Sequence, residues 1–167
     1  MTMLSTETTA ATQNPLELLE EIVGANDWSF ERLSAEEMLV EISGRWCHYR
    51  LFFFWQDDVS AMQFSCQFDM RVLPNRRAAV VELLAVINER LWLGHFDIDG
   101  EASSPMFRHT TLLRGAQGAS VEQLEDLIDI AITECDRFFP VFQFVVWGGK
   151  SAHEAVSAAI LDTVAEA

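Results

Sequence analysis

Two neighbouring stretches in which apolar side chains alternate with other types constrain the fold of this chain most strongly. Successive side chains of a β-strand point to opposite faces, so such alternation indicates a strand with two different sides. One side of both stretches is apolar throughout, whereas the other is mixed between residues 45 and 55 and mostly polar between residues 61 and 70. The pattern predicts a sheet with one covered face and one face in water. The expected covered side consists of Cys47, Tyr49, Leu51, Phe53, Trp55, Met62, Phe64, Cys66, Phe68 and Met70.

The mixed side of the first stretch carries three aromatic residues, Trp46, Phe52 and Phe54. A contiguous apolar patch on a surface marks an interaction site, whereas isolated exposed apolar residues are common. We therefore take these three as candidate partner-binding residues. The alternative is that they cover a sheet edge or pack under a loop, and alternation alone does not separate the two.

Residues 74–98 predict one long helix followed directly by a strand. Pro74 suits the first helical turn, and Gly94 can adopt the left-handed conformation that ends a helix. We expect Trp92 and Leu93 to pack the helix end against the sheet, and a strand to begin at His95 because apolar residues alternate after it. The helical stripe consists of Val80, Val81, Leu83, Leu84, Ile87 and Leu91.

The other segments complete an α+β domain with helices packed on one face of an antiparallel, meandering sheet. The expected order is α-β-β-β-β-α-β-β-α, with a short helix after Ser151. A capping box at Ser120 opens the third helix, and we expect a kink rather than an end at Pro140. We assign residues 1–13 to a disordered tail and residues 14–167 to a single domain.

The charge of the chain excludes several classes of partner. Eleven Lys and Arg against 26 Asp and Glu give a net charge of −15, which repels nucleic acid and anionic membranes. Three cysteines in apolar runs are typical of free thiols in a reducing compartment. No signal peptide and no run of about 18 apolar residues is present, so we expect a cytoplasmic protein.

Motifs that would carry chemistry are incomplete. The run 148–151 ends like a phosphate-binding loop, but Phe144 stands where that loop needs a glycine. The run 97–101 resembles part of a calcium loop, but half of the ligand set is missing. His95 and His109 could approach each other across paired strands, yet two histidines alone do not make a zinc site. We therefore predict no catalytic residue, no metal and no cofactor.

Three segments resemble the YbjN family of bacterial proteins. They are Asn88–Asp97, Met106–His109 and Phe142–Ser151, and the resemblance extends over nearly the whole chain. It implies a sensory transduction regulator with a fold similar to that of type III secretion chaperones, which are small proteins that often dimerise and bind other polypeptides. It supplies no catalytic residue.

The sequence thus favours a non-catalytic regulatory or chaperone-like module that binds protein partners and forms a homodimer. The alternative is a small-molecule sensor or an unrecognised enzyme. In that case His95, Arg108 and His109 would line a pocket that holds an anionic ligand.

Overall fold

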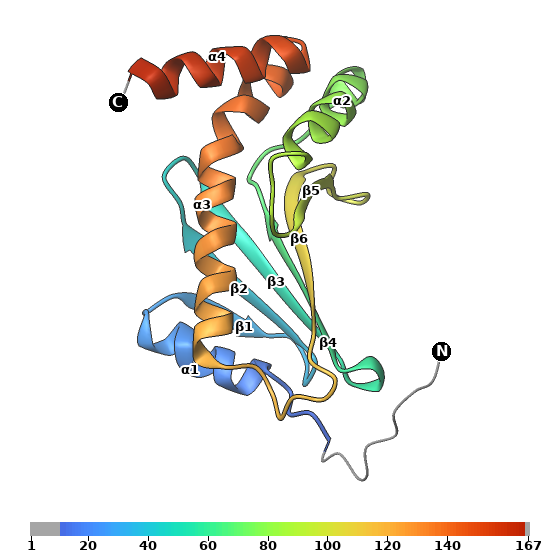
Figure 1. Cartoon of the computed structure of the whole chain (residues 1–167), viewed down its shortest axis with the longest axis vertical. Helices are drawn as coiled ribbons and strands as arrows, with labels where there is room; N and C mark the ends of the chain where they lie inside the picture. The colour runs from blue at the N-terminus through green and yellow to red at the C-terminus, as the bar shows by residue number, and fades with distance from the viewer. Residues whose placement is uncertain (1–10, 166–167) are drawn as a thin grey trace.

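The fold is an open antiparallel sheet with helices on one side (Figure 1). The computed structural model describes the backbone of residues 11–165 and the side chains of residues 11–159. Most of the predicted tail, residues 1–10, lies outside that range. Thr12 and Gln13 lie inside it, and the Gln13 N–H donates to the Gln117 carbonyl at 2.8 Å. Hydrogen-bonded structure therefore begins before the predicted boundary at Asn14.

Six strands form the sheet in the spatial order β1-β2-β3-β4-β6-β5, and every neighbouring pair is antiparallel. The predicted α+β class and the meander β1 to β4 are confirmed. The strands are β1 (Ser29–Arg32), β2 (Glu37–Ser43), β3 (His48–Gln56), β4 (Ala61–Gln67), β5 (His95–Ile98) and β6 (Pro105–Leu112).

Among the described residues, four α-helices accompany the sheet, and α1 and α3 cover one of its faces (Figure 1). The capping box at Ser120 is confirmed, because its side chain accepts from the Gln123 N–H and the Gln123 side chain accepts in return from the Ser120 N–H. Helix α3 continues through Pro140. The helices are α1 (Leu16–Ala25), α2 (Arg77–Asn88), α3 (Val121–Val146) and α4 (Ala152–Ala165).

The core lies between the sheet and α3, as alternation predicts. Tyr49, Leu51, Phe53 and Trp55 of β3 are at most 1% exposed. Phe68 and Phe96 pack their rings against Phe142 of α3 with centroids 5.3 and 5.5 Å apart. The face predicted to be covered is therefore the one that faces the helices.

The central helix is shorter than predicted. A 3-10 turn over Pro74–Arg76 precedes α2, and α2 ends at Asn88 instead of Gly94. After Asn88 the backbone continues in turns in which the Arg90 and Leu91 N–H groups donate to the Ile87 and Asn88 carbonyls. The side chain of Asn88 bonds both backbone groups of Phe96 in β5. Gly94 adopts φ +64°, as a chain reversal requires, but that reversal leads from a turn into β5.

Two further expectations around this helix are wrong. Trp92 is 78% exposed and does not pack the chain against the sheet, whereas Leu93 is partly buried against the core. Val81 is 50% exposed and does not belong to the buried stripe. Because the helix ends four residues before Trp92, the helical phase that would direct this side chain inward is lost.

Candidate protein-binding face

The side of the sheet opposite α1 and α3 carries side chains that are only partly buried. We call this surface the bare face; the strand register aligns its side chains in rows across the sheet. One row runs through Leu39, Phe52, Ser65 and Arg108. Helices bury apolar side chains on the other face almost completely, so the bare face is the part of the sheet left for an additional layer.

Phe52 and Phe54 lie on this face, as predicted, and are neither sealed nor fully exposed. Leu39 is the cross-strand neighbour of Phe52, and Met106 lies two strands away. The guanidinium of Arg50 lies 5.4 Å from the centre of the Phe52 ring. The face therefore presents an apolar centre with charged side chains at its margin.

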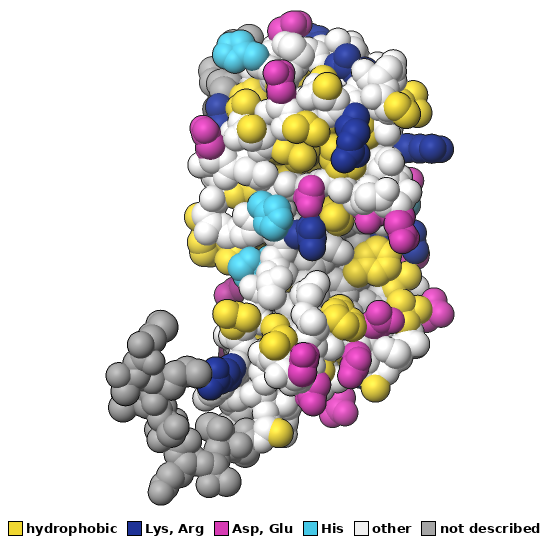
Figure 2. Space-filling view, turned by 90° about the vertical axis from the view of Figure 1, so that its right-hand side faces the viewer, with side chains coloured by type: hydrophobic (Ala, Val, Ile, Leu, Met, Phe, Trp, Pro, Cys, Tyr) yellow, Lys and Arg dark blue, Asp and Glu magenta, His cyan; other side chains and the backbone are white. Residues whose placement is uncertain are grey.

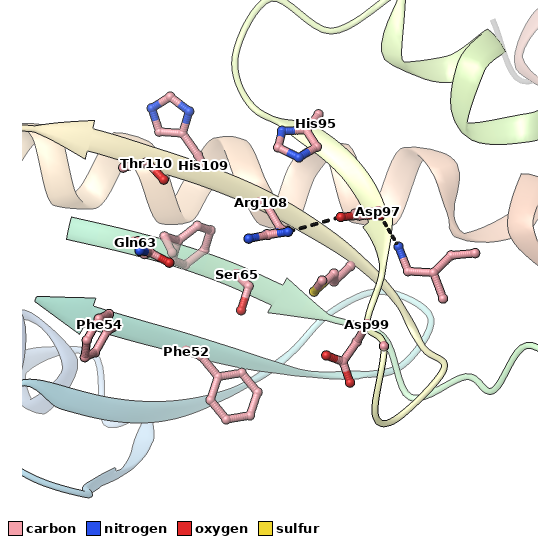
Figure 3. A pocket seen from close by; sticks show the side chains of 14 residues that line it. Phe52, Phe54, Gln63, Ser65, His95, Asp97, Asp99, Arg108, His109 and Thr110 are labelled. Carbon is pink, nitrogen blue, oxygen red and sulfur yellow. Dashed lines mark hydrogen bonds and ion pairs between the residues drawn. The ribbon is translucent and has the colours of Figure 1, made fainter. Parts of the chain in front are cut away.

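A shallow hollow of about 390 Å³ lies between the two phenylalanines and β5 (Figure 3). It brings together five of the six residues proposed from the sequence. They are Phe52, Phe54, His95, Arg108 and His109. The β5–β6 loop forms one wall through Asp99 and Gly100.

The charges in the hollow largely neutralise one another. Arg108 Nη1 lies 3.1 Å from Asp97 Oδ2, and the two side chains are 45% and 41% exposed. Asp99 Oδ2 accepts from the Ala102 N–H at 2.6 Å, which stabilises the turn of the loop. An anionic ligand would have to displace Asp97 and approach Asp99, so the site is poorly suited to a free anion.

The two histidines do not act together on the bare face. Strand alternation directs the imidazole of His109 to the side opposite Arg108. Burial, and then the nearby charge of His95, lower the pKa of His109 from its usual 6.5. His109 is therefore neutral at neutral pH. Within the described residues, no group of three or more His, Cys, Asp or Glu could hold a metal ion.

Trp46 lies apart from the other candidates. It belongs to the turn between β2 and β3, because β3 begins only at His48. Its indole N–H donates to the Asp136 carbonyl of α3 at 3.1 Å, and the Asp136 carboxylate accepts from the Arg45 N–H and the Tyr49 hydroxyl. The ring is 48% exposed, but its N–H helps fasten the hairpin to α3.

The hollow beside Trp46 offers no activated nucleophile. It has a volume of about 540 Å³ and includes Cys47 and His48 in its lining. Burial raises the pKa of the Cys47 thiol above its usual value, which keeps the thiol protonated. The expectation of buried free thiols holds for Cys66 and Cys135, whereas Cys47 is only half-buried.

Sequence reasoning missed Leu39, Met106 and Asp97 as parts of the bare face. Each lies on a strand that the sequence predicts, but the sequence did not give the order of the strands in the sheet. The polar or charged residues that alternate along β2 and β5 gave the only available signal.

The arrangement defines a small α+β protein in which one sheet face is covered by helices and the other is open. A family model described as "Putative bacterial sensory transduction regulator" matches residues 15–144, and the chain belongs to this family, YbjN. The crystal structure of YbjN from E. coli, "a putative transcription regulator", has a similar fold with a TM-score of 0.51. It shares 14% sequence identity, and the match covers 72% of this chain and 85% of that one. No curated protein matches the chain.

The resemblance predicted from the three segments is thus confirmed at the level of family and fold. The predicted similarity to type III secretion chaperones stays a prediction. In the part of the chain that the structure describes, no helix has the length and apolar character needed to cross a membrane.

Proposed function

We propose that this chain is a non-catalytic regulatory module that binds another polypeptide on the bare face of its sheet. The observation that carries the proposal is the partly buried pair Phe52 and Phe54, next to Leu39 and lining the same hollow as Met106, on the side that α1 and α3 leave open. Aromatic side chains in such a setting supply large contact area and are enriched where proteins bind one another.

The charges around this apolar centre favour a basic partner segment. Glu37, Glu41 and Glu101 are exposed around the sheet, and the chain carries a net charge of −15. Arg50 and Arg108 are already engaged with Phe52 and Asp97. A partner with apolar side chains flanked by Lys or Arg would therefore complement both the centre and the margin.

A homodimer is the second form that such binding could take, and it remains a prediction. The apolar centre is available to a second copy, but two chains of charge −15 repel each other. Molar-mass measurement of the purified chain at low and high salt tests this. A dimer that forms only at high salt and dissociates in the Phe52→Ser, Phe54→Ser variant would identify a second copy as the occupant.

Site-specific photo-crosslinking in bacterial cells tests the main proposal. A photoreactive phenylalanine analogue at position 52 is expected to crosslink to another polypeptide, whereas the same group at Glu82 on α2 gives no such product. The identified partner is then purified. The Phe52→Ser, Phe54→Ser variant should bind it at least about tenfold more weakly, as expected for interface aromatics.

The matched control changes two polar residues of the same face, Gln63→Ser and Thr110→Ser, and should leave affinity nearly unchanged. Both variants should retain the melting temperature of the original chain to within a few degrees, because neither removes a core side chain. Unfolding of the double phenylalanine variant, or equal crosslinking from positions 52 and 82, would show that these rings serve the domain's own packing.

The alternative of an anionic small-molecule sensor has one observation in its favour, the size of the hollow, which is within the range of ligand sites. The pairing of Arg108 with Asp97 weighs against it. A thermal-shift screen with anionic metabolites tests this alternative. The sensor would be favoured if one compound raised the melting temperature of the original chain and did not change that of the Arg108→Gln variant.

A further inference from the structure

The two outer edges of the sheet differ in whether their backbone groups are already bonded. In an antiparallel pair, alternate residues direct both the N–H and the C=O toward the neighbouring strand, and the residues between direct them outward. The outermost strands, β1 and β5, each have one outward-facing row. Such rows can pair with another chain unless something blocks them.

The edge at β5 is blocked by two side chains. The Asn88 amide donates to the Phe96 carbonyl at 3.1 Å and accepts from the Phe96 N–H at 2.7 Å. Asp97 Oδ1 accepts from the Ile98 N–H at 2.8 Å (Figure 3). The outward N–H groups of Phe96 and Ile98 and the outward carbonyl of Phe96 are therefore occupied from within the chain.

The edge at β1 is not blocked in this way. The Leu33 N–H donates to the Glu37 carbonyl, which fixes the phase of the β1–β2 pair and turns the backbone groups of Phe30 and Arg32 outward. No hydrogen-bond partner among the described residues reaches the outward N–H of Phe30 or Arg32. Ser29, Phe30 and Glu31 are all exposed, so an incoming strand has access.

The segment that forms the open edge is rich in acidic residues and carries a negative net charge. Residues 14–43, which build α1, β1 and β2, contain eight Asp and Glu and a single basic residue, Arg32. That guanidinium is held by Glu20 at 3.0 Å and by the carbonyls of Ser34 and Ala35. Residues 71–114, which build the β5 side, contain six Arg and five acids, and Figure 2 shows both signs mixed there.

The two sides of β1 require different side chains from an added strand. Phe30 shares a face with the buried Val40 and is 39% exposed, so it offers an apolar contact on the helix side. Glu31 lies on the bare face, opposite Leu39. An added strand would match this edge when apolar residues alternate with Lys or Arg along it.

We propose that β1 is the docking edge for an extended partner segment in which basic and apolar residues alternate, bound as a seventh strand. This inference rests on the proposed protein-binding function and specifies where the partner's backbone is held and which segment fits. Main-chain bonds to Phe30 and Arg32 supply affinity, and the alternation supplies specificity.

The test uses the full chain and a synthetic seven-residue peptide of alternating lysine and valine. A peptide of the same composition, with its lysines and valines in separate blocks, is the control. The alternating peptide should bind, and amide exchange of Phe30 and Arg32 should slow in the complex while amides of α2 stay unchanged. Absence of binding, or equal binding of both peptides without protection at β1, overturns the inference.

Two substitutions at one position separate the backbone contact from the side chain. Phe30→Ala keeps the outward N–H, whereas Phe30→Pro removes it, and proline is tolerated on strand edges. Affinity should fall by about tenfold or more in Phe30→Pro relative to Phe30→Ala, the scale expected for lost main-chain bonds. Equal affinities overturn the inference; if Phe30→Pro fails to fold, the exchange measurement on the original chain decides.

The same assay distinguishes this inference from the proposed function of the bare face. Loss of peptide binding in Phe30→Pro, with no effect of Phe52→Ser and Phe54→Ser on any partner, would leave the edge inference standing and remove the bare-face proposal. Unchanged peptide binding in Phe30→Pro, with loss of partner binding in the Phe52→Ser, Phe54→Ser variant, would support the bare-face proposal and overturn the edge inference.

Discussion

The two edge strands of the sheet have the same length but opposite surroundings. β5 is held between Asn88, Asp97 and a tight glycine turn, and three of its outward groups, both of Phe96 and the N–H of Ile98, are bonded within the chain. β1 lies in an acidic segment and leaves its outward groups to solvent or to a partner. Natural sheets usually protect their edges because an open edge invites pairing. This difference between the edges is the reason why we propose strand pairing at β1 and not at β5.

The largest effect should come from the turn that places β5. Gly94 has φ +64°, and a Cβ there would contact the Phe107 ring and lie 2.7 Å from the Arg108 carbonyl oxygen. Gly94→Ala should lower the free energy of unfolding by about 3 kcal/mol through backbone strain and overpacking. Urea unfolding measures this. Gly100→Ala, where a Cβ meets nothing within 4 Å, is the control and should change little.

The next effect should come from removing the closure of β5. Asn88→Ala leaves both backbone groups of the buried Phe96 without their partner, which should lower the free energy of unfolding by about 2 kcal/mol. It should also make the molar mass depend on concentration, because an edge is exposed.

Phe30→Ala on β1 provides the contrast for this variant. It should cost about 1 kcal/mol, because the Phe30 ring is 39% exposed and the outward backbone groups already face water. If Asn88→Ala were as stable as Phe30→Ala and remained monomeric, the two edges would not differ in the way we describe.

A smaller effect should separate the two roles of Asp97. Asp97→Ala removes the acceptor for the Ile98 N–H and the ion pair with Arg108, and should cost about 1 kcal/mol. Arg108→Ala removes only the ion pair between half-exposed groups and should cost less than about 0.5 kcal/mol. Equal losses in chemical denaturation would mean that the ion pair, rather than closure of the edge, is what Asp97 provides.

The smallest effect should be a pH dependence confined to the β5 side. The folded chain lowers the pKa of His109, so below its usual 6.5 the unfolded chain binds a proton more readily than the folded one. The contribution of His109 to the free energy of unfolding should therefore be fully present above that pH and be lost as the pH is lowered toward the folded-state pKa. Unfolding curves between pH 7.5 and 5, an interval set by the ordinary histidine range, should be less pH-dependent in His109→Gln. An unchanged slope would assign the pH dependence to other groups.

Sequence alternation predicted the covered and bare faces correctly, because successive side chains of a strand point to opposite faces and the apolar ones face the core. Phe53 and Phe52 are neighbours in the chain, yet one is 1% exposed and the other remains partly exposed, as their alternation required. The boundary of α2 was not predictable in the same way. Helical spacing continues past Asn88, but the backbone leaves the helix there and the Asn88 side chain bonds Phe96 of β5, a contact that spacing does not indicate.

The candidate site shows the same division. Phe52, Phe54, His95 and Arg108 were each identified from the sequence, and the fold brings them around one hollow on the bare face. His109 also lines this hollow, but strand alternation directs its imidazole away from Arg108. Trp46 was assigned to the same face because it alternates in the sequence with the other side chains of that face. The strand begins only at His48, so Trp46 lies in the preceding turn. Alternation of side chains assigns a face only to residues inside a strand. Here β3 begins after a hairpin turn whose residues are bonded to Asp136 of α3.

The amino-acid sequence by itself determined the class of fold, the two faces of the sheet, the acidity and the membership of the YbjN family, because each depends on local pattern, composition or shared segments. The tertiary structure alone decided which strands became the edges and which edge was closed. Asn88 and Phe96 come from different elements, and a side chain can satisfy a distant backbone group only after the sheet and helix have packed together.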